Sequence, residues 1–109
     1  MNYNIIISEN FKKELKPLAK KFPSIKSDIQ YLLDNIEKEL ALSTDLGGGF
    51  RKIKLKIKSK GKGSSGGGRI ISHETIIAIN ETNLVFGSIY NKTDFDSINI
   101  SILKKTLRL

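Results

Sequence analysis

The sequence predicts an α+β domain in which two N-terminal helices pack on one face of a small, mostly antiparallel sheet. Apolar residues recur at helical spacing in the first third of the chain and at every second position from residue 50, and a short helical pattern ends the chain. This succession gives the element order β-α-α-β-β-β(-β)-α. A length of 109 residues suits a single domain, which we place at residues 1–109.

The N-terminal segment is expected to form a strand followed by a helix. Residues 3–8 are a short apolar run typical of a strand, and Ser8 or Asn10 can cap the helix that follows. Residues 11–22 place four large apolar side chains on one helical face. Pro17 lies inside this pattern and should kink the helix or split it.

A second helix is expected over residues 25–40. Pro23 interrupts the chain before it, and Ser24 can cap it. Its apolar residues, at spacings of three and four, form a continuous stripe that should pack on the sheet. Residues 41–49 contain a glycine cluster and are expected to form a loop.

From Phe50 onward the pattern is that of strands. Ile53, Leu55 and Ile57 alternate with lysines, which predicts a strand with one buried and one solvated face. The following residues predict a Gly/Ser loop at 59–68, strands at 69–73, 75–79 and 83–90 with a turn at 80–82, a polar loop at 91–98 and a short helix beginning at Asn99 or Ser101. The sheet face away from the helices is left for water or for a ligand.

Composition argues against a metal, a cofactor and a membrane partner, and it favours a negatively charged one. The chain has no cysteine, one histidine and no metal-ligand spacing, so we expect no metal and no cofactor. It has no long apolar run and its N-terminus does not resemble a signal peptide, so we expect no membrane partner and a cytoplasmic location. A net charge of +8 favours a polyanionic partner such as RNA.

The lysines of the predicted strand, Lys52, Lys54, Lys56 and Lys58, form a row on its wet face. Alternate strand residues are about 6.6 Å apart, similar to consecutive phosphates of a single strand, so the row could follow an RNA backbone. Lysines also protect exposed edge strands against aggregation, and the row by itself fits both interpretations.

Further residues could complete a site beside this row. Arg51 begins the same strand, Arg69 follows the glycine loop, and Tyr90 and Lys92 end the last strand. If the strands are neighbours, these side chains converge on one patch. RNA cleavage without metal needs a base for the 2′-hydroxyl, cations around the phosphate and an acid for the leaving oxygen. Clustered lysines can supply an amine base, because like charges lower an amine's pKa.

Four segments resemble the RelE/HigB branch of bacterial type II toxins. They are F-K-K-E-L-K-P-L near the start, R-K-I-K-L, K-G-K-G-S-S-G-G-G-R-I-I and I-Y-N-K, and the resemblance spans roughly residues 3 to 107. It implies a RelE-like microbial RNase fold and an mRNA interferase that cuts messages, often in the ribosomal A site. It also implies a cognate antitoxin that holds the toxin silent.

The resemblance also implies roles for individual residues. Lys52 and Lys54 match the family's candidates for general base and phosphate contacts, and Arg69 matches the arginine that stabilises the transition state. Tyr90 matches a tyrosine that stacks on a base or orients the 2′-hydroxyl. The residues expected to bind RNA or the ribosome are Arg51, Lys56, Lys58, Lys60, Lys62 and Lys92, with His73 as a possible further site residue. Some members use a C-terminal basic residue, for which this chain offers Lys104, Lys105 and Arg108.

Two alternative functions remain. The related ParE branch shares the fold implied by the resemblance but inhibits DNA gyrase, although its strand is generally less rich in lysine. A basic RNA-binding module without catalytic activity would show the same charge pattern.

Overall fold

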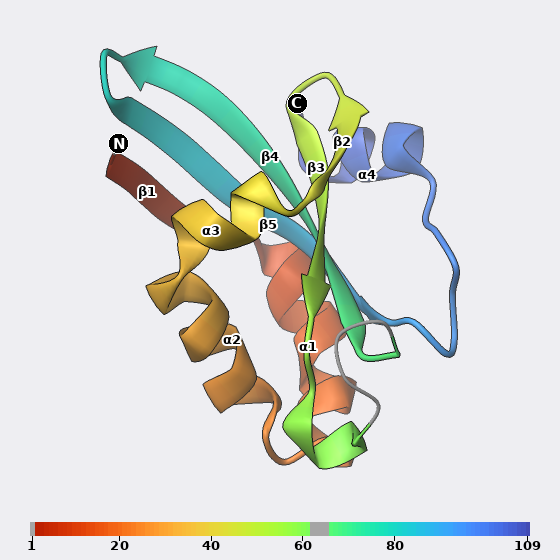
Figure 1. Ribbon diagram of the computed structural model, residues 1–109. Coiled ribbons are helices and arrows are strands. Elements are labelled where there is room, and N and C mark those ends of the chain that lie inside the picture. Colours follow the sequence, from red (N-terminus) through yellow and green to blue (C-terminus); the bar gives the residue numbers. More distant parts are fainter. Residues whose placement is uncertain (1, 62–65) are drawn as a thin grey trace.

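The computed structural model describes residues 2–61 and 66–109, and Figure 1 shows their arrangement. The elements in chain order are β1 (Asn2–Ile7), α1 (Glu9–Lys21), α2 (Ile25–Asp34), α3 (Ile36–Ala41), β2 (Thr44–Gly47), β3 (Phe50–Leu55), the 3-10 turn η1 (Lys58–Lys60), β4 (Gly68–Ala78), β5 (Glu81–Asn91) and α4 (Ile100–Thr106).

The described strands form a single sheet in the order β1-β5-β4-β3-β2. β1 runs parallel to β5, and the other three pairs are antiparallel. This confirms the predicted α+β class with a mostly antiparallel sheet. The long β4–β5 hairpin extends past β3 at one end of the molecule, at the upper left in Figure 1, where β1 runs beside β5.

Helices cover both faces of the sheet. The main core joins Phe11 of α1 and Ile29 of α2 to sheet residues such as Ile70 and Ile89. Because neighbouring strand residues point to opposite faces, Ile71 lies on the other side, where it packs in a second cluster with Phe50, Tyr90 and Leu103 of α4. Figure 1 shows α4 on the far side of the sheet from α1, α2 and α3. The expectation that this face is left free is therefore corrected, because α4 covers part of it.

The first helix forms as expected, whereas the second is divided. The Ser8 side chain accepts a hydrogen bond from the Phe11 N–H and caps α1, which continues through Pro17 without splitting. The predicted helix over residues 25–40 breaks at Asn35, whose side chain donates to the Tyr31 carbonyl at 2.9 Å. An asparagine that bonds locally to the backbone competes with helix continuation, which accounts for the break. Ser24 makes no side-chain cap bond.

The strand boundaries differ from the prediction in three places. Residues 44–47 of the expected glycine loop form β2, which pairs with β3. β3 ends at Leu55, so Lys56 follows the strand and Lys58 lies in η1. The expected strands at 69–73 and 75–79 are one strand, β4, and the turn lies at residues 79–80, where Asn80 has φ +65°.

Side chains of α1 seal the edge of β5 beyond the end of β1. Glu14 Oε1 accepts hydrogen bonds from the Asn10 side chain at 3.0 Å, from Ser88 Oγ at 2.7 Å and from the Ile89 N–H at 3.3 Å. Asn10 also donates to the Gly87 carbonyl at 2.9 Å. An unpaired strand edge can pair with another chain, and these contacts cover that edge. They also hold the last part of β5, which carries Tyr90.

Candidate functional site

Sheet register places three of the four predicted catalytic residues in one row. Lys54 of β3 lies directly opposite Arg69 of β4, and Arg69 lies directly opposite Tyr90 of β5. Directly opposite residues share a face, with Cβ atoms about 4.5–5.5 Å apart. Lys52 lies two residues before Lys54 on the same face, opposite Ile71. The expectation that these strands are neighbours is confirmed, and we call Lys54, Arg69 and Tyr90 the cross-strand row.

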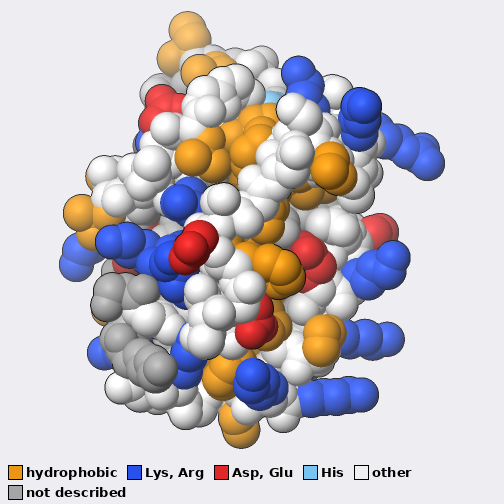
Figure 2. Space-filling view, turned by 90° about the vertical axis from the view of Figure 1, so that its right-hand side faces the viewer, with side chains coloured by type: hydrophobic (Ala, Val, Ile, Leu, Met, Phe, Trp, Pro, Cys, Tyr) orange, Lys and Arg blue, Asp and Glu red, His pale blue; other side chains and the backbone are white. Residues whose placement is uncertain are grey.

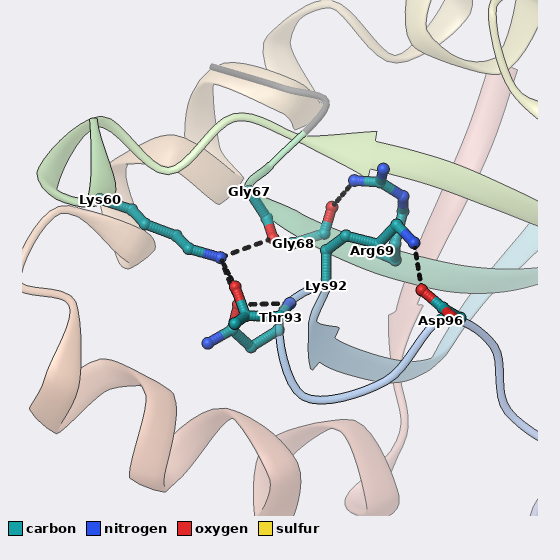
Figure 3. A network of polar contacts seen from close by, with 8 residues as sticks. Lys60, Gly67, Gly68, Arg69, Lys92, Thr93 and Asp96 are labelled. Carbon is teal, nitrogen blue, oxygen red and sulfur yellow. Dashed lines mark hydrogen bonds and ion pairs between the residues drawn. The ribbon is translucent and has the colours of Figure 1, made fainter. Parts of the chain in front are cut away.

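Arg69 is held firmly in this row. Its side chain is buried, with only 5% of the residue exposed, and its Nη1 donates to the Gly68 carbonyl at 2.9 Å (Figure 3). Burying a guanidinium costs free energy unless hydrogen bonds replace those it made with water. The arginine therefore presents a fixed positive charge between Lys54 and Tyr90.

Tyr90 lies deeper than its predicted role requires. Only 4% of the residue is exposed, and its ring meets the Phe95 ring edge-on, with centroids 6.2 Å apart. Burial raises the pKa of the Tyr90 hydroxyl, Arg69 lowers it and Asp96 raises it. Within residues 2–61 and 66–109 this hydroxyl has no hydrogen-bond partner. It is a neutral donor beside a cation, but in this arrangement the ring has no open face for a base.

An acidic side chain accompanies the basic ones. Asp96 Oδ1 lies 2.7 Å from Lys92 Nζ (Figure 3). The hydrogen bond from Lys92 and its charge lower the pKa of Asp96, with a smaller contribution from the charge of Lys52. Asp96 is therefore an ionised carboxylate within reach of two lysines of the site. Figure 2 shows basic side chains gathered beside the grey atoms, with an acidic side chain among them.

Lys60 has a structural position instead of the expected open one. Its ammonium donates to Asn91 Oδ1 at 2.5 Å, to Thr93 Oγ1 at 2.7 Å and, more weakly, to the Gly67 carbonyl at 3.5 Å (Figure 3). These bonds tie η1 to the end of β5. Binding of RNA by Lys60 would compete with these bonds and stays a prediction, and Lys62 lies outside the described residues.

The lysine row is shorter than predicted. Only Lys52 and Lys54 lie on β3, so regular strand spacing does not extend to Lys56 and Lys58. Both of these lysines are exposed, and they line a groove of about 420 Å³ together with Lys54 and the exposed Tyr31. They are exposed cations in a groove that joins the cross-strand row at Lys54.

Two further candidates lie elsewhere. Arg51 has its guanidinium 3.3 Å from a carboxylate oxygen of Glu74 and 3.3 Å from Ser43 Oγ. Since it alternates with Lys52, it faces the α1–α3 side of the sheet, which corrects its expected place in the patch. His73 packs against the Phe50 ring at 4.7 Å and lies four residues beyond Arg69, about 13 Å along the strand. His73 is therefore separated from Arg69 along β4, and its place in the site stays a prediction.

The C-terminal basic residues do not join the row. Lys104 and Lys105 lie on exposed positions of α4. Arg108 lines a separate groove of about 1010 Å³ between α1 and the end of the chain. Asp96 and Phe95 are the site neighbours that sequence reasoning missed. The only sequence signal for the acid was its spacing of four residues from Lys92.

Comparisons with known proteins assign no family to the chain. No protein-family model and no curated protein matches the chain. Among the described residues, no group of three or more His, Cys, Asp or Glu side chains is placed to hold a metal ion. No helix in that part of the chain is both long and apolar enough to cross a membrane.

Proposed function

We propose that the chain is a RelE/HigB-like toxin of a type II toxin–antitoxin system, an endoribonuclease that cuts mRNA without a metal and so inhibits translation. The observation that supports this best is the cross-strand row, which aligns a lysine, an arginine and a tyrosine across three adjacent strands. The net charge of +8 and the segments that resemble the family favour the same function.

The proposed reaction is an internal transesterification. A lysine amine, of Lys52 or Lys54, takes the proton of the ribose 2′-hydroxyl, and the 2′-oxygen attacks the adjacent phosphorus. The bond from phosphorus to the 5′-oxygen breaks, and that oxygen takes up a proton. The products are a 2′,3′-cyclic phosphate and a 5′-hydroxyl. Arg69 stabilises the charge that gathers on the phosphoryl oxygens, and the neutral Tyr90 hydroxyl offers a hydrogen bond to an anionic oxygen.

The partners follow from this function. The substrate is mRNA, bound to the ribosome, with ribosomal RNA contacted by exposed lysines such as Lys56 and Lys58. A cognate antitoxin with acidic residues would neutralise the basic face. These partners place the protein in the cytoplasm.

The test is cleavage of mRNA on programmed ribosomes in the presence of EDTA. We expect a cut near the A site that leaves a 2′,3′-cyclic phosphate. Arg69→Ala should reduce the rate by about 100-fold or more, the size of loss seen when one transition-state donor is removed. Lys20→Ala, which removes one exposed charge from α1, is the matched control and should change the rate less than about twofold. Equal rates for Arg69→Ala and wild type would contradict the proposed mechanism.

The burial of Arg69 and Tyr90 favours one alternative, a basic RNA-binding module without catalysis. Such a module would bind the ribosome and leave mRNA intact with every variant. Binding without cleavage under the conditions above would select this function.

A further inference from the structure

Residues 93–99, which we call the strap, connect Lys92, the residue after β5, to α4 and contact the site through two side chains. The Phe95 ring lies edge-on to Tyr90, and the Asp96 carboxylate pairs with Lys92. A nucleotide would bring the same two groups, a ring and an anion. We propose that the strap is an internal mimic of the nucleotide and must be displaced before RNA reaches Arg69 and Tyr90. This inference rests on the proposed RNA-binding function of the row.

The ends of the strap are fixed. At the start, the Asn91 carbonyl accepts hydrogen bonds from the Asp94 N–H at 2.9 Å and the Phe95 N–H at 3.2 Å, and Lys60 holds Asn91 and Thr93. At the other end, Ile98 packs in the second core cluster, next to the helix that follows. The strap therefore stays beside the site whether or not its middle is in contact.

The middle of the strap is loosely held. Phe95 is 55% exposed, and the side chain of Asp96 is 94% exposed. An ion pair this exposed stabilises its contact only slightly and is screened by salt. Tyr90 is 4% exposed and the Phe95 ring lies against it, so RNA can reach the Tyr90 ring on this side only if Phe95 moves. An RNA phosphate that replaces Asp96 on Lys92 would compensate for the lost ion pair.

Charge distinguishes this role from that of an ordinary surface loop. The strap carries two carboxylates, Asp94 and Asp96. Among the ion pairs within the described part of the chain, Asp96 takes part in one and Asp94 in none. If the strap competes with RNA, neutralising Asp96 should favour RNA more than neutralising Asp94. If it is an ordinary loop, the two substitutions should act alike, since each removes one negative charge.

The experiment measures binding of a single-stranded 2′-O-methyl RNA oligonucleotide, which lacks the attacking hydroxyl and cannot be cleaved. At low salt Asp96→Asn should bind about two- to five-fold more tightly than wild type, the range expected for one exposed ion pair. The matched control, Asp94→Asn, should show a smaller gain, and the difference between the variants should shrink at high salt. Amide hydrogen exchange supplies a second measurement, since the Phe95 N–H should exchange faster when the oligonucleotide is bound.

Each outcome separates this proposal from the nuclease. Equal affinities for the two variants, or slower exchange at Phe95 on binding, would overturn the strap proposal and leave the nuclease proposal intact. Tighter binding by Asp96→Asn without cleavage of mRNA on programmed ribosomes would support the strap and contradict the nuclease. If neither wild type nor variant binds the oligonucleotide, the strap proposal is refuted, and the nuclease proposal is decided by the ribosome assay.

Discussion

The turn between β2 and β3 offers a direct test of how β3 is held in register beside β4. Gly49 has φ +86°, and its carbonyl accepts the Glu74 N–H at 2.9 Å. A Cβ at Gly49 would lie 2.9 Å from the Glu74 carbonyl oxygen and 3.1 Å from His73 Nε2. Gly47 has nearly the same φ, +85°, but a Cβ there would have no atom within 4 Å. The two glycines therefore share a left-handed backbone conformation, but only at Gly49 would an added Cβ meet other atoms.

The expected magnitudes follow from these geometries. An L-residue in the left-handed region costs about 1–2 kcal/mol, so Gly47→Ala should lower the free energy of unfolding by about that much. Gly49→Ala introduces the same backbone strain and also a clash with the backbone of β4. The clash should lower the free energy of unfolding by about 1–3 kcal/mol more, as in other overpacked sites. Its total is therefore about 2–5 kcal/mol.

Urea denaturation followed by far-UV circular dichroism measures both values, since the chain has no tryptophan for a fluorescence signal. The reasoning requires that Gly49→Ala lose more stability than Gly47→Ala at an unchanged m value. Equal losses would show that the contact with Glu74 and His73 does not hold the turn, and that β3 is kept in register by other means.

The remaining predictions concern Glu14 and Tyr90. Glu14→Ala removes the acceptor of three hydrogen bonds at the β5 edge and should cost about 1.5–3 kcal/mol in urea denaturation, whereas Glu9→Ala, which loses only an exposed pair with Lys12, should cost about 0.5 kcal/mol. Tyr90→Phe removes a buried unpaired hydroxyl, so stability should stay unchanged or rise by about 1 kcal/mol, and a clear loss would show that the hydroxyl has a partner. Burial raises the pKa of Tyr90, so the folded state favours the neutral hydroxyl over the ionised one. The contribution of neutral Tyr90 to stability is therefore present below about pH 10 and is lost as the pH rises through the folded-state pKa. Alkaline titration of tyrosinate absorbance should show a delayed step that Tyr90→Phe removes.

Much of the site could be predicted because strand alternation is local. Alternation placed Lys52 and Lys54 on one face, and the same rule excludes Arg51 from it, although the sequence interpretation grouped Arg51 with the patch because it is close in the chain. His73 shares the face of Arg69 but lies too far along β4, a distance that strand geometry also fixes once both residues belong to one strand. The predicted strand at 69–73 already contained both residues, so their separation could be read from the sequence.

Local sequence by itself determined the apolar stripes of the helices, the buried side of β3 and the excess of positive charge, and it offered Ser8 as one of two candidate caps for α1. Tertiary structure alone decided which residues meet. The pairing of Lys54 with Arg69 depends on register across the long segment between β3 and β4, which no local pattern fixes. Arg69 and Tyr90 lie on two strands joined by a short turn, but their pairing depends on the two register shifts along that hairpin. Burial of Tyr90 depends on packing between distant parts of the chain, since Phe50 of β3 and Leu103 of α4 lie in the same cluster. The alternation of side chains depends on a few neighbouring residues. Strand register and burial depend on contacts between distant segments, which form only in the folded domain.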